Sequence, residues 1–329
     1  MITQAKFLAA LSGLVKRTKA DGVSVCARAK TRRVFRFAYE AIHQDLVQES
    51  VSVTVKVVDD RRVGVASADT LESAGLTRCA AAAQEIARYS PRQDRLPPLP
   101  SRHRAASSAD YVKAMAAVTP AENVAALKHL FRLCTGAGAA LAGSLVTGED
   151  EFAVVNSSGV ACYTASTVAA AKLVTMYGAL SGYASGVHRD LRRLQLEEIL
   201  KRSLEQSLHR AQPLAVPLGA YEVILEPEAV AELVVWLGYT AFGAKSVEER
   251  TSFLAGRMGE RVMDPQITIY DDGTDPKALR LPFDFEGVPK RRTVLIDRGR
   301  AAGIVYDSVY GERFGRYPID PTLIFTLKK

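Results

Sequence analysis

Five carboxylates lie close together between residues 271 and 286 of the sequence. Such a cluster could ligate a divalent cation through oxygen or carry out acid–base chemistry. The competing interpretation is that DDG and DP are turn formers between strands. Glu286, followed by Gly287 in FDFEGVP, fits a plain turn least well. The five are Asp271, Asp272, Asp275, Asp284 and Glu286.

The histidines offer no self-contained zinc site. A zinc protease places two histidines on one helix face, beside a carboxylate that can act as a base. Here each histidine stands alone, and no HExxH motif occurs: His43, His103, His129, His188 and His209. We therefore interpret all five as surface or packing residues.

Motifs for nucleophilic catalysis and for phosphate binding are missing as well. The sequence has no GxSxG elbow, no GxxxxGK[ST] loop and no GxGxxG loop. GAKS at 243–246 is interpreted as a helix cap, and NSSG at 156–159 as a turn. No nucleophile therefore stands out from the sequence.

Composition and charge bound the function only loosely. The chain has 48% hydrophobic residues and a net charge of +7, which leaves nucleic acid as an alternative partner. The basic residues are spread over many short clusters, and a solvated surface is the preferred interpretation. No apolar run is long enough to cross a bilayer. The cysteines lie far apart in apolar or helical surroundings, which favours reduced thiols and a cytoplasmic location: Cys26, Cys79, Cys134 and Cys162.

The elements of the first part of the chain follow from its periodicity. The N-terminus predicts an amphipathic helix rather than a signal peptide. Alternating residues then predict strands, with DDRR at 59–62 as a hairpin turn. Asp69, three residues before Glu72, predicts the cap of an Ala-rich helix that runs to Ile86. The residues expected to face the core from the first helix are Phe7, Leu11, Leu14 and Val15.

The middle of the chain begins with a Pro-rich linker at 90–108. Thr119, Pro120 and Glu122 predict a capped helix, which Gly136 can end. An antiparallel meander follows, with GED at 148–150 and NSSG as its turns. SGYASGVHRD at 181–190 is predicted to be a Gly- and Ser-rich loop, and a helix is expected from about Leu194 to Ala211.

The last third opens with EVIL at 222–225, predicted to be a strand, and a helix that starts at Pro227. The core-facing stripe of this helix is expected to be Val230, Leu233, Val234 and Leu237. Ser246 and Glu249 predict the cap of another helix. Strands are then expected at QITIY, FDFEG, RRTVLID and AAGIVYDS.

These patterns predict an α+β protein of two domains, with antiparallel or mixed sheets and packed helices. The first domain is expected at 1–213, with subdomains at about 1–90 and 108–213. The second, strand-rich domain is expected at 214–329.

Several stretches, taken in order, resemble the TldD/PmbA family, labelled modulators of DNA gyrase and also linked to peptide maturation. The matching pieces are VTVKVVDDRRVGVASADTL, VVNSSGVACYTASTVAAAKL, GAYEVILEPEAVAELV, SFLAGRMGERV, ITIYDDG and FDFEGVPKRRTVLIDRGRAAGIVYDS. Together they cover nearly the whole chain.

The resemblance implies one of two kinds of subunit. TldD-type chains resemble metalloproteases with an HExxxH helix, whereas PmbA chains, also called TldE, lack the motif and pair with TldD. At the corresponding place this sequence reads VWLGYT, so a degenerate site holds Val235, Trp236 and Thr240. The resemblance therefore implies a PmbA/TldE-like chain that binds no cofactor itself, with zinc expected in a TldD-type partner.

Three functions are carried forward. The first is a non-catalytic, cytoplasmic subunit that pairs with a TldD-type partner, or with itself, and holds unfolded or extended peptides for proteolysis or maturation. Its peptide-binding residues are unknown. The second is a module that binds DNA or DNA gyrase. The third is an independent hydrolase that uses the carboxylates from Asp271 to Glu286.

The resemblance also leads us to expect a shortened C-terminal domain, because family members generally continue past YDS with a Gly-rich, strand-rich segment.

Overall fold

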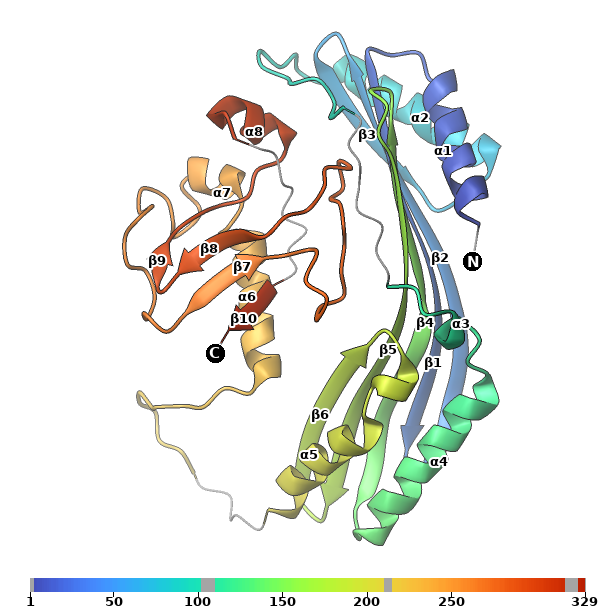
Figure 1. Cartoon of the computed structure of the whole chain (residues 1–329), viewed down its shortest axis with the longest axis vertical. Coiled ribbons are helices and arrows are strands. Elements are labelled where there is room, and N and C mark those ends of the chain that lie inside the picture. Colours follow the sequence, from blue (N-terminus) through green and yellow to red (C-terminus); the bar gives the residue numbers. More distant parts are fainter. Residues whose placement is uncertain (1–2, 102–109, 210–214, 317–324, 329) are drawn as a thin grey trace.

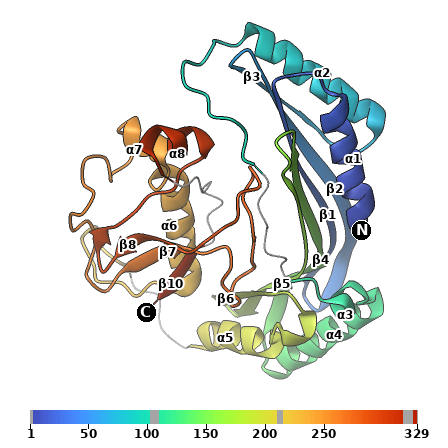
Figure 2. The same ribbon diagram turned by 45° about the horizontal axis from the view of Figure 1, so that its top comes forward.

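A computed structural model describes residues 3–101, 110–209, 215–316 and 325–328. The fold is α+β with antiparallel sheets, as the sequence predicts. A long, curved sheet carries helices on its outer side, and the C-terminal region lies against its inner side (Figures 1 and 2). No helix among the described residues is long and apolar enough to cross a membrane.

The large sheet has six strands in the order β3-β2-β1-β4-β5-β6, and all neighbours are antiparallel. Side chains alternate between the two faces of the sheet, apart from a register shift between Arg36 and Phe37. On β2 the buried residues Val53, Val55 and Val57 thereby all face the outer helices. The strands are β1 (Gly22–Ala38), β2 (Ala41–Asp59), β3 (Arg62–Ala68), β4 (Ala140–Asn156), β5 (Ala161–Tyr177) and β6 (Leu180–His188).

Two apolar clusters fill the outer side of this sheet. One packs α1 (Gln4–Arg17) and α2 (Ser73–Tyr89) against the upper half, and it contains the predicted core residues Phe7, Leu11 and Leu14. The other packs α4 (Pro120–Gly136) and α5 (Leu196–Leu208) against the lower half. The predicted capping box at Thr119 is confirmed. Two short helical segments, α3 (Lys113–Ala116) and η1 (Leu191–Arg193), complete this part.

Three local predictions in the N-terminal part are wrong. GED at 148–150 lies inside β4, paired with both β1 and β5, and is no turn. The expected loop at 181–190 is largely strand β6, whose Gly182 permits α5 to pack closely because an added Cβ would lie 1.9 Å from the Ser203 carbonyl oxygen. Asp69 caps nothing, since α2 begins after Glu72, whose backbone N–H donates to the Thr70 hydroxyl instead.

The turns at 59–62 and 156–159 are confirmed. Asp60 and Arg61 adopt positive φ between β2 and β3. The Asn156 side chain accepts from the N–H groups of Ser158 and Val160. Residues 90–101 have no regular structure, in line with a linker, and the rest of the predicted linker, 102–108, lies outside the described residues.

The C-terminal region forms a smaller sheet in the order β10-β7-β8-β9, with α6 packed on it. Its elements are α6 (Pro227–Thr240), α7 (Ala244–Glu248), β7 (Thr268–Asp271), β8 (Thr293–Asp297), β9 (Arg300–Ala301), α8 (Ser308–Phe314) and β10 (Phe325–Lys328). QITIY and RRTVLID are therefore confirmed as strands. The domain boundary near residue 213 stays a prediction, and residues 210–214 are outside the described part.

Other predictions for this region are wrong. EVIL at 222–225 joins no strand, and FDFEG makes only an isolated bridge between Phe283 and Pro289. Ser246 does not cap the next helix, because α7 begins at Ala244 with Gly243 as its N-cap. The helix also ends early, because the N–H groups of Thr251 and Ser252 donate to the Ser246 carbonyl. AAGIVYDS contributes the end of β9 and isolated bridges at Val305 and Tyr306, not a continuous strand.

Candidate functional site

The C-terminal region reaches the inner side of the large sheet through residues 281–290, which we call the contact segment. Phe283 is buried and stacks on Phe152 of β4, with ring centroids 5.2 Å apart. Gly287 has φ +82°, and an added Cβ would lie 2.4 Å from a methyl group of Val160. Only glycine therefore fits here, which explains one part of FDFEGVP that a turn alone does not.

Glu286 lies at the centre of this contact. One of its carboxylate oxygens, Oε2, accepts hydrogen bonds from the backbone N–H and the hydroxyl of Ser308, at the start of α8. The other, Oε1, is 3.6 Å from Nζ of Lys56 on β2. The ion pair thus joins the C-terminal region to the large sheet.

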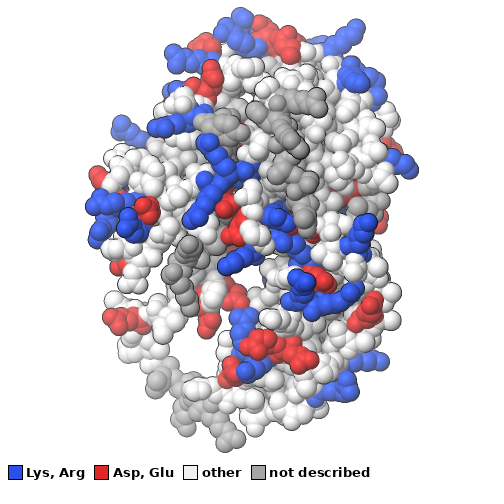
Figure 3. Space-filling view, viewed as in Figure 1, with Lys and Arg blue, Asp and Glu red and all other residues white. Residues whose placement is uncertain are grey.

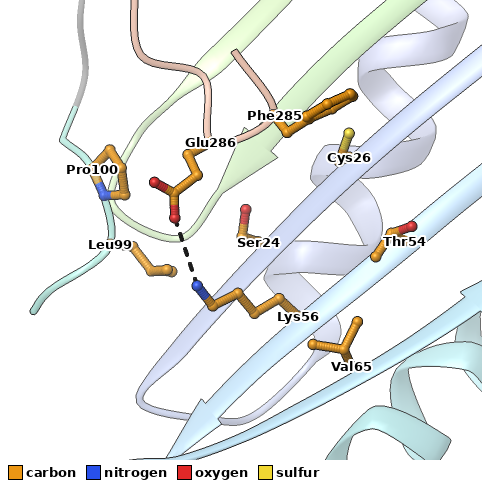
Figure 4. A pocket seen from close by; sticks show the side chains of 9 residues that line it. All are labelled: Ser24, Cys26, Thr54, Lys56, Val65, Leu99, Pro100, Phe285 and Glu286. Carbon is orange, nitrogen blue, oxygen red and sulfur yellow. Dashed lines mark ion pairs between the residues drawn. The ribbon is translucent and has the colours of Figure 1, made fainter. Parts of the chain in front are cut away.

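A cavity of about 220 Å³ opens beside this ion pair (Figure 4). Ser24 and Cys26 of β1 and Thr54 of β2 point into it, while Leu99 and Pro100 come from the segment after α2. Phe285 and Val65 supply further apolar walls. The cavity combines hydroxyl groups with one ammonium and one carboxylate, so it suits a small group that has both an apolar part and a polar end.

A second cavity, of about 360 Å³, lies on the other side of Glu286. Gly238 and Tyr239 at the end of α6 line it, together with Asp307 and Tyr310 near α8. Burial, followed by the nearby carboxylates of Glu248, Glu249 and Asp307, raises the pKa of Tyr310. Glu286 is thus shared by two cavities, one against the large sheet and one against α6.

The three degenerate-site residues of the sequence lie on α6. Val235 and Trp236 are exposed, and the Trp236 ring packs edge-on against Tyr239. The Thr240 hydroxyl donates to the Trp236 carbonyl within the helix. These side chains do not fit a zinc ion, because none of them is an imidazole, thiolate or carboxylate.

The acidic cluster does not come together as a metal site. Asp272, Asp275 and Asp284 accept hydrogen bonds from backbone N–H groups two to four residues further along the chain, which confirms the turn interpretation for these three. Asp271 forms a fully buried ion pair with Lys290, at 2.6 Å. Among the described residues, no group of three or more His, Cys, Asp or Glu side chains could hold a metal ion.

The histidines are also separate. His129 pairs with Glu197 on the outer surface, and His188 interacts with the backbone of Asp190. His103 lies outside the described residues.

Sequence reasoning missed a second polar link between the two regions. Asp110 is buried, and its carboxylate accepts from the backbone and the guanidinium of Arg280. Arg189, at the end of β6, lies 3.1 Å from the same carboxylate. These residues are 170 and 79 positions from Asp110 in the sequence, so no local pattern could reveal the link.

Parts of the sequence match known proteins. Residues 218–319 match the family model of the PmbA/TldA metallopeptidase C-terminal domain. An uncharacterised protein of Methanocaldococcus jannaschii is 30% identical over 164 residues, which cover 50% of this chain and 39% of that protein. The metalloprotease TldD homologue of Haemophilus influenzae is 32% identical over 119 residues, 35% of this chain and 24% of that protein.

A solved structure shares the fold. TldE of Thermococcus kodakarensis matches with a TM-score of 0.78 and 22% identity, covering 94% of this chain and 72% of that one. The chain thus shares a fold with TldE over almost all its length, while its match to the first curated relative spans well under half of that protein.

Proposed function

Residues 218–319 match the PmbA/TldA metallopeptidase C-terminal domain, and from this match we propose that the chain is a non-catalytic, PmbA/TldE-like subunit. In this proposal a TldD-type partner supplies the zinc ion and the hydrolytic chemistry. This chain contributes binding surface for an unfolded or extended peptide. A cytoplasmic location is part of the same proposal.

The observation that carries the proposal is the surface of α6. Where the resemblance implies two histidines and a glutamate in a TldD-type chain, α6 presents Val235, Trp236 and Thr240. Neither zinc coordination nor activation of a water molecule is within the chemistry of these side chains. The remainder of the helix is still intact, with Val234 buried in the cluster that includes the small sheet.

The candidate site supports a binding role rather than a catalytic one. Glu286 is already held by two donors from Ser308 and by the Lys56 ammonium. A carboxylate fixed in this way is suited to orienting a bound polar group. We propose that the cavity beside Lys56 receives one end of a peptide, and that the peptide backbone adds to an open strand edge of the small sheet.

The test is to purify the chain alone and together with a TldD-type protein from the same source. The chain alone is expected to bind no stoichiometric zinc by elemental analysis and to leave unfolded peptide substrates intact. The complex is expected to cleave them. Stoichiometric zinc in the isolated chain, or peptidase activity of the isolated chain, would contradict the proposal.

DNA or gyrase binding remains the alternative, motivated by the net charge of +7. On the face shown in Figure 3, however, Lys and Arg are interspersed with Asp and Glu. DNA binding predicts an affinity that falls steeply with added salt. Fluorescence anisotropy at low salt tests it, and an absence of binding there ends this alternative. The independent hydrolase finds no support, because the carboxylates from Asp271 to Glu286 serve turns and ion pairs.

A further inference from the structure

Helix α6 is apolar around most of its circumference, yet the described residues cover only one side of it. Val234 and Gly238 are buried, and Val230 and Leu237 are partly buried against the small sheet. Leu233 is 55% exposed, Trp236 61% and Tyr239 79%. A helix that is hydrophobic all round is normally buried, so the uncovered side of α6 is suited to packing against another polypeptide.

The segment before α6 has the same property. Val223 is 70% exposed and Ile224 is 99% exposed, although β-branched residues favour half-buried strands. Residues 221–225 make no backbone–backbone hydrogen bond to another described residue. The strand that the sequence predicts at 222–225 therefore has a backbone ready for pairing. We call the exposed residues of this segment and of α6 the uncovered surface: Leu218, Tyr221, Val223, Ile224, Leu225, Leu233, Val235, Trp236 and Tyr239.

The edge of the large sheet is treated differently. At β6, the Gln206 side chain accepts from the Tyr183 N–H and the Arg202 guanidinium donates to the Ser185 carbonyl, both at 2.8 Å. Side chains of α5 thus occupy backbone groups of this edge strand, a common protection against pairing with other chains. Residues 222–225 have no such cover among the described residues.

The charge of the uncovered surface indicates what kind of chain fits it. From residue 215 to residue 240 there are four glutamates and no lysine or arginine, in a chain whose net charge is +7. Glu222, Glu226 and Glu232 are exposed, whereas Glu228 lies near Arg202. A second copy in a two-fold contact would bring like charges together, because both copies present the same patch. A different chain with an apolar strand and basic flanking residues is the complementary occupant.

We propose that the uncovered surface is the docking site of the partner subunit, which adds a strand to residues 221–225 and covers Trp236 and Leu233 of α6. The identity of the occupant as a TldD-type chain rests on the function proposed above. Main-chain hydrogen bonds to 221–225 supply affinity, and the apolar face of α6 together with its acidic rim supplies specificity.

The experiment uses the full chain co-purified with a TldD-type protein from the same source. Trp236→Glu is expected to weaken the complex by about 30-fold or more, because a central aromatic residue is replaced by a charge. Ile224→Pro removes a donor from the pairing segment and is expected to weaken it as well. Tyr89→Glu is the matched control, because Tyr89 is 85% exposed and belongs to α2, a helix on the outer side of the large sheet. Thermal unfolding of each variant alone verifies that it is folded.

Hydrogen exchange of the complex gives the second measurement. Slowed exchange of the amides of 221–225 on binding, together with sensitivity to Trp236→Glu and not to Tyr89→Glu, supports the docking site. A complex that keeps its peptidase activity and its affinity in the Trp236→Glu variant overturns the docking site and leaves the proposed function standing. A complex that is weakened by Trp236→Glu but hydrolyses no peptide supports the docking site and overturns the proposed function. No complex at all, or a homodimer through 221–225, overturns the docking site.

Discussion

Helices α1 and α6 have the same length, 14 residues, but they bury their apolar side chains very differently. α1 turns Phe7, Leu11, Leu14 and Val15 to the large sheet, and exposes no large apolar side chain. α6 buries little more than Val234 and Gly238, and leaves Trp236 and Tyr239 in solvent. α1 is complete within this chain, whereas α6 has a second apolar side that the described residues do not cover.

This difference shows that an apolar residue on a helix can serve either the stability of the fold or association with another chain. On α1 the apolar stripe stabilises the fold, because each side chain is removed from water. On α6 the exposed apolar residues add nothing comparable to the stability of the isolated chain. Their value is to be realised in association, where burial of aromatic side chains dominates binding energy.

The largest effect is expected at α1. Phe7 is fully buried and packs edge-on against Tyr163, so Phe7→Ala should lower the free energy of unfolding by about 3–5 kcal/mol. Chemical denaturation of the purified chain measures this loss. A loss below 1 kcal/mol would mean that α1 is not the self-sufficient helix described above.

A smaller loss is expected where the two regions touch. In Gly287→Ala the new Cβ would meet Val160 at 2.4 Å, and φ is +82°. We expect a cost of about 1–3 kcal/mol. Gly136→Ala is the control, since no atom lies within 4 Å of its added Cβ, and it should be neutral or slightly stabilising. Equal effects of the two changes in denaturation would show that the contact segment is not held as tightly as the structure indicates.

Alkaline pH should affect the large sheet through Tyr111. Burial, followed by its hydrogen bond to Glu149, raises the pKa of Tyr111 from 10.0 to about 12. The stabilisation that comes with the neutral phenol is therefore complete below pH 10 and is lost as pH rises from 10 through about 12. Tyr111→Phe should make the loss of stability in this range shallower, as followed by circular dichroism. An unchanged slope would contradict the assignment to Tyr111.

The smallest effect on stability is expected at α6. Trp236→Ala should change the free energy of unfolding of the isolated chain by no more than about 0.5 kcal/mol, because the side chain is largely in solvent. Denaturation of the chain without its partner is the measurement. A loss as large as that of Phe7→Ala would remove the contrast between the two helices.

The sequence predicts secondary structure correctly where the local residue pattern matches the burial of the element. Alternation placed β1, β2 and β3, and the Thr119–Glu122 box placed the start of α4. The prediction fails where packing against an element distant in sequence determines the local structure. Gly182 and Gly186 looked like loop residues, but they are small because α5 lies against β6. EVIL has the composition of a strand, yet no described strand pairs with it.

The candidate site shows the same limit. Glu286 stood out in the sequence because FDFEGVP does not read as a simple turn. Its partners Lys56 and Ser308 are remote from it in sequence and meet it only after the fold is formed. The Asp110–Arg280 link likewise had no local signal.

The contact segment also couples the unfolding of the C-terminal region to that of the large sheet. The fully buried Lys290–Asp271 ion pair fixes the last residue of the contact segment to the C-terminal region. Phe283, near the start of the segment, lies in a cluster with Phe152 and Val154 of the large sheet. Separating the regions would expose both sides of that cluster at once. The two cores are therefore expected to melt in a single cooperative transition, so that heat resistance gained in one is passed on to the other.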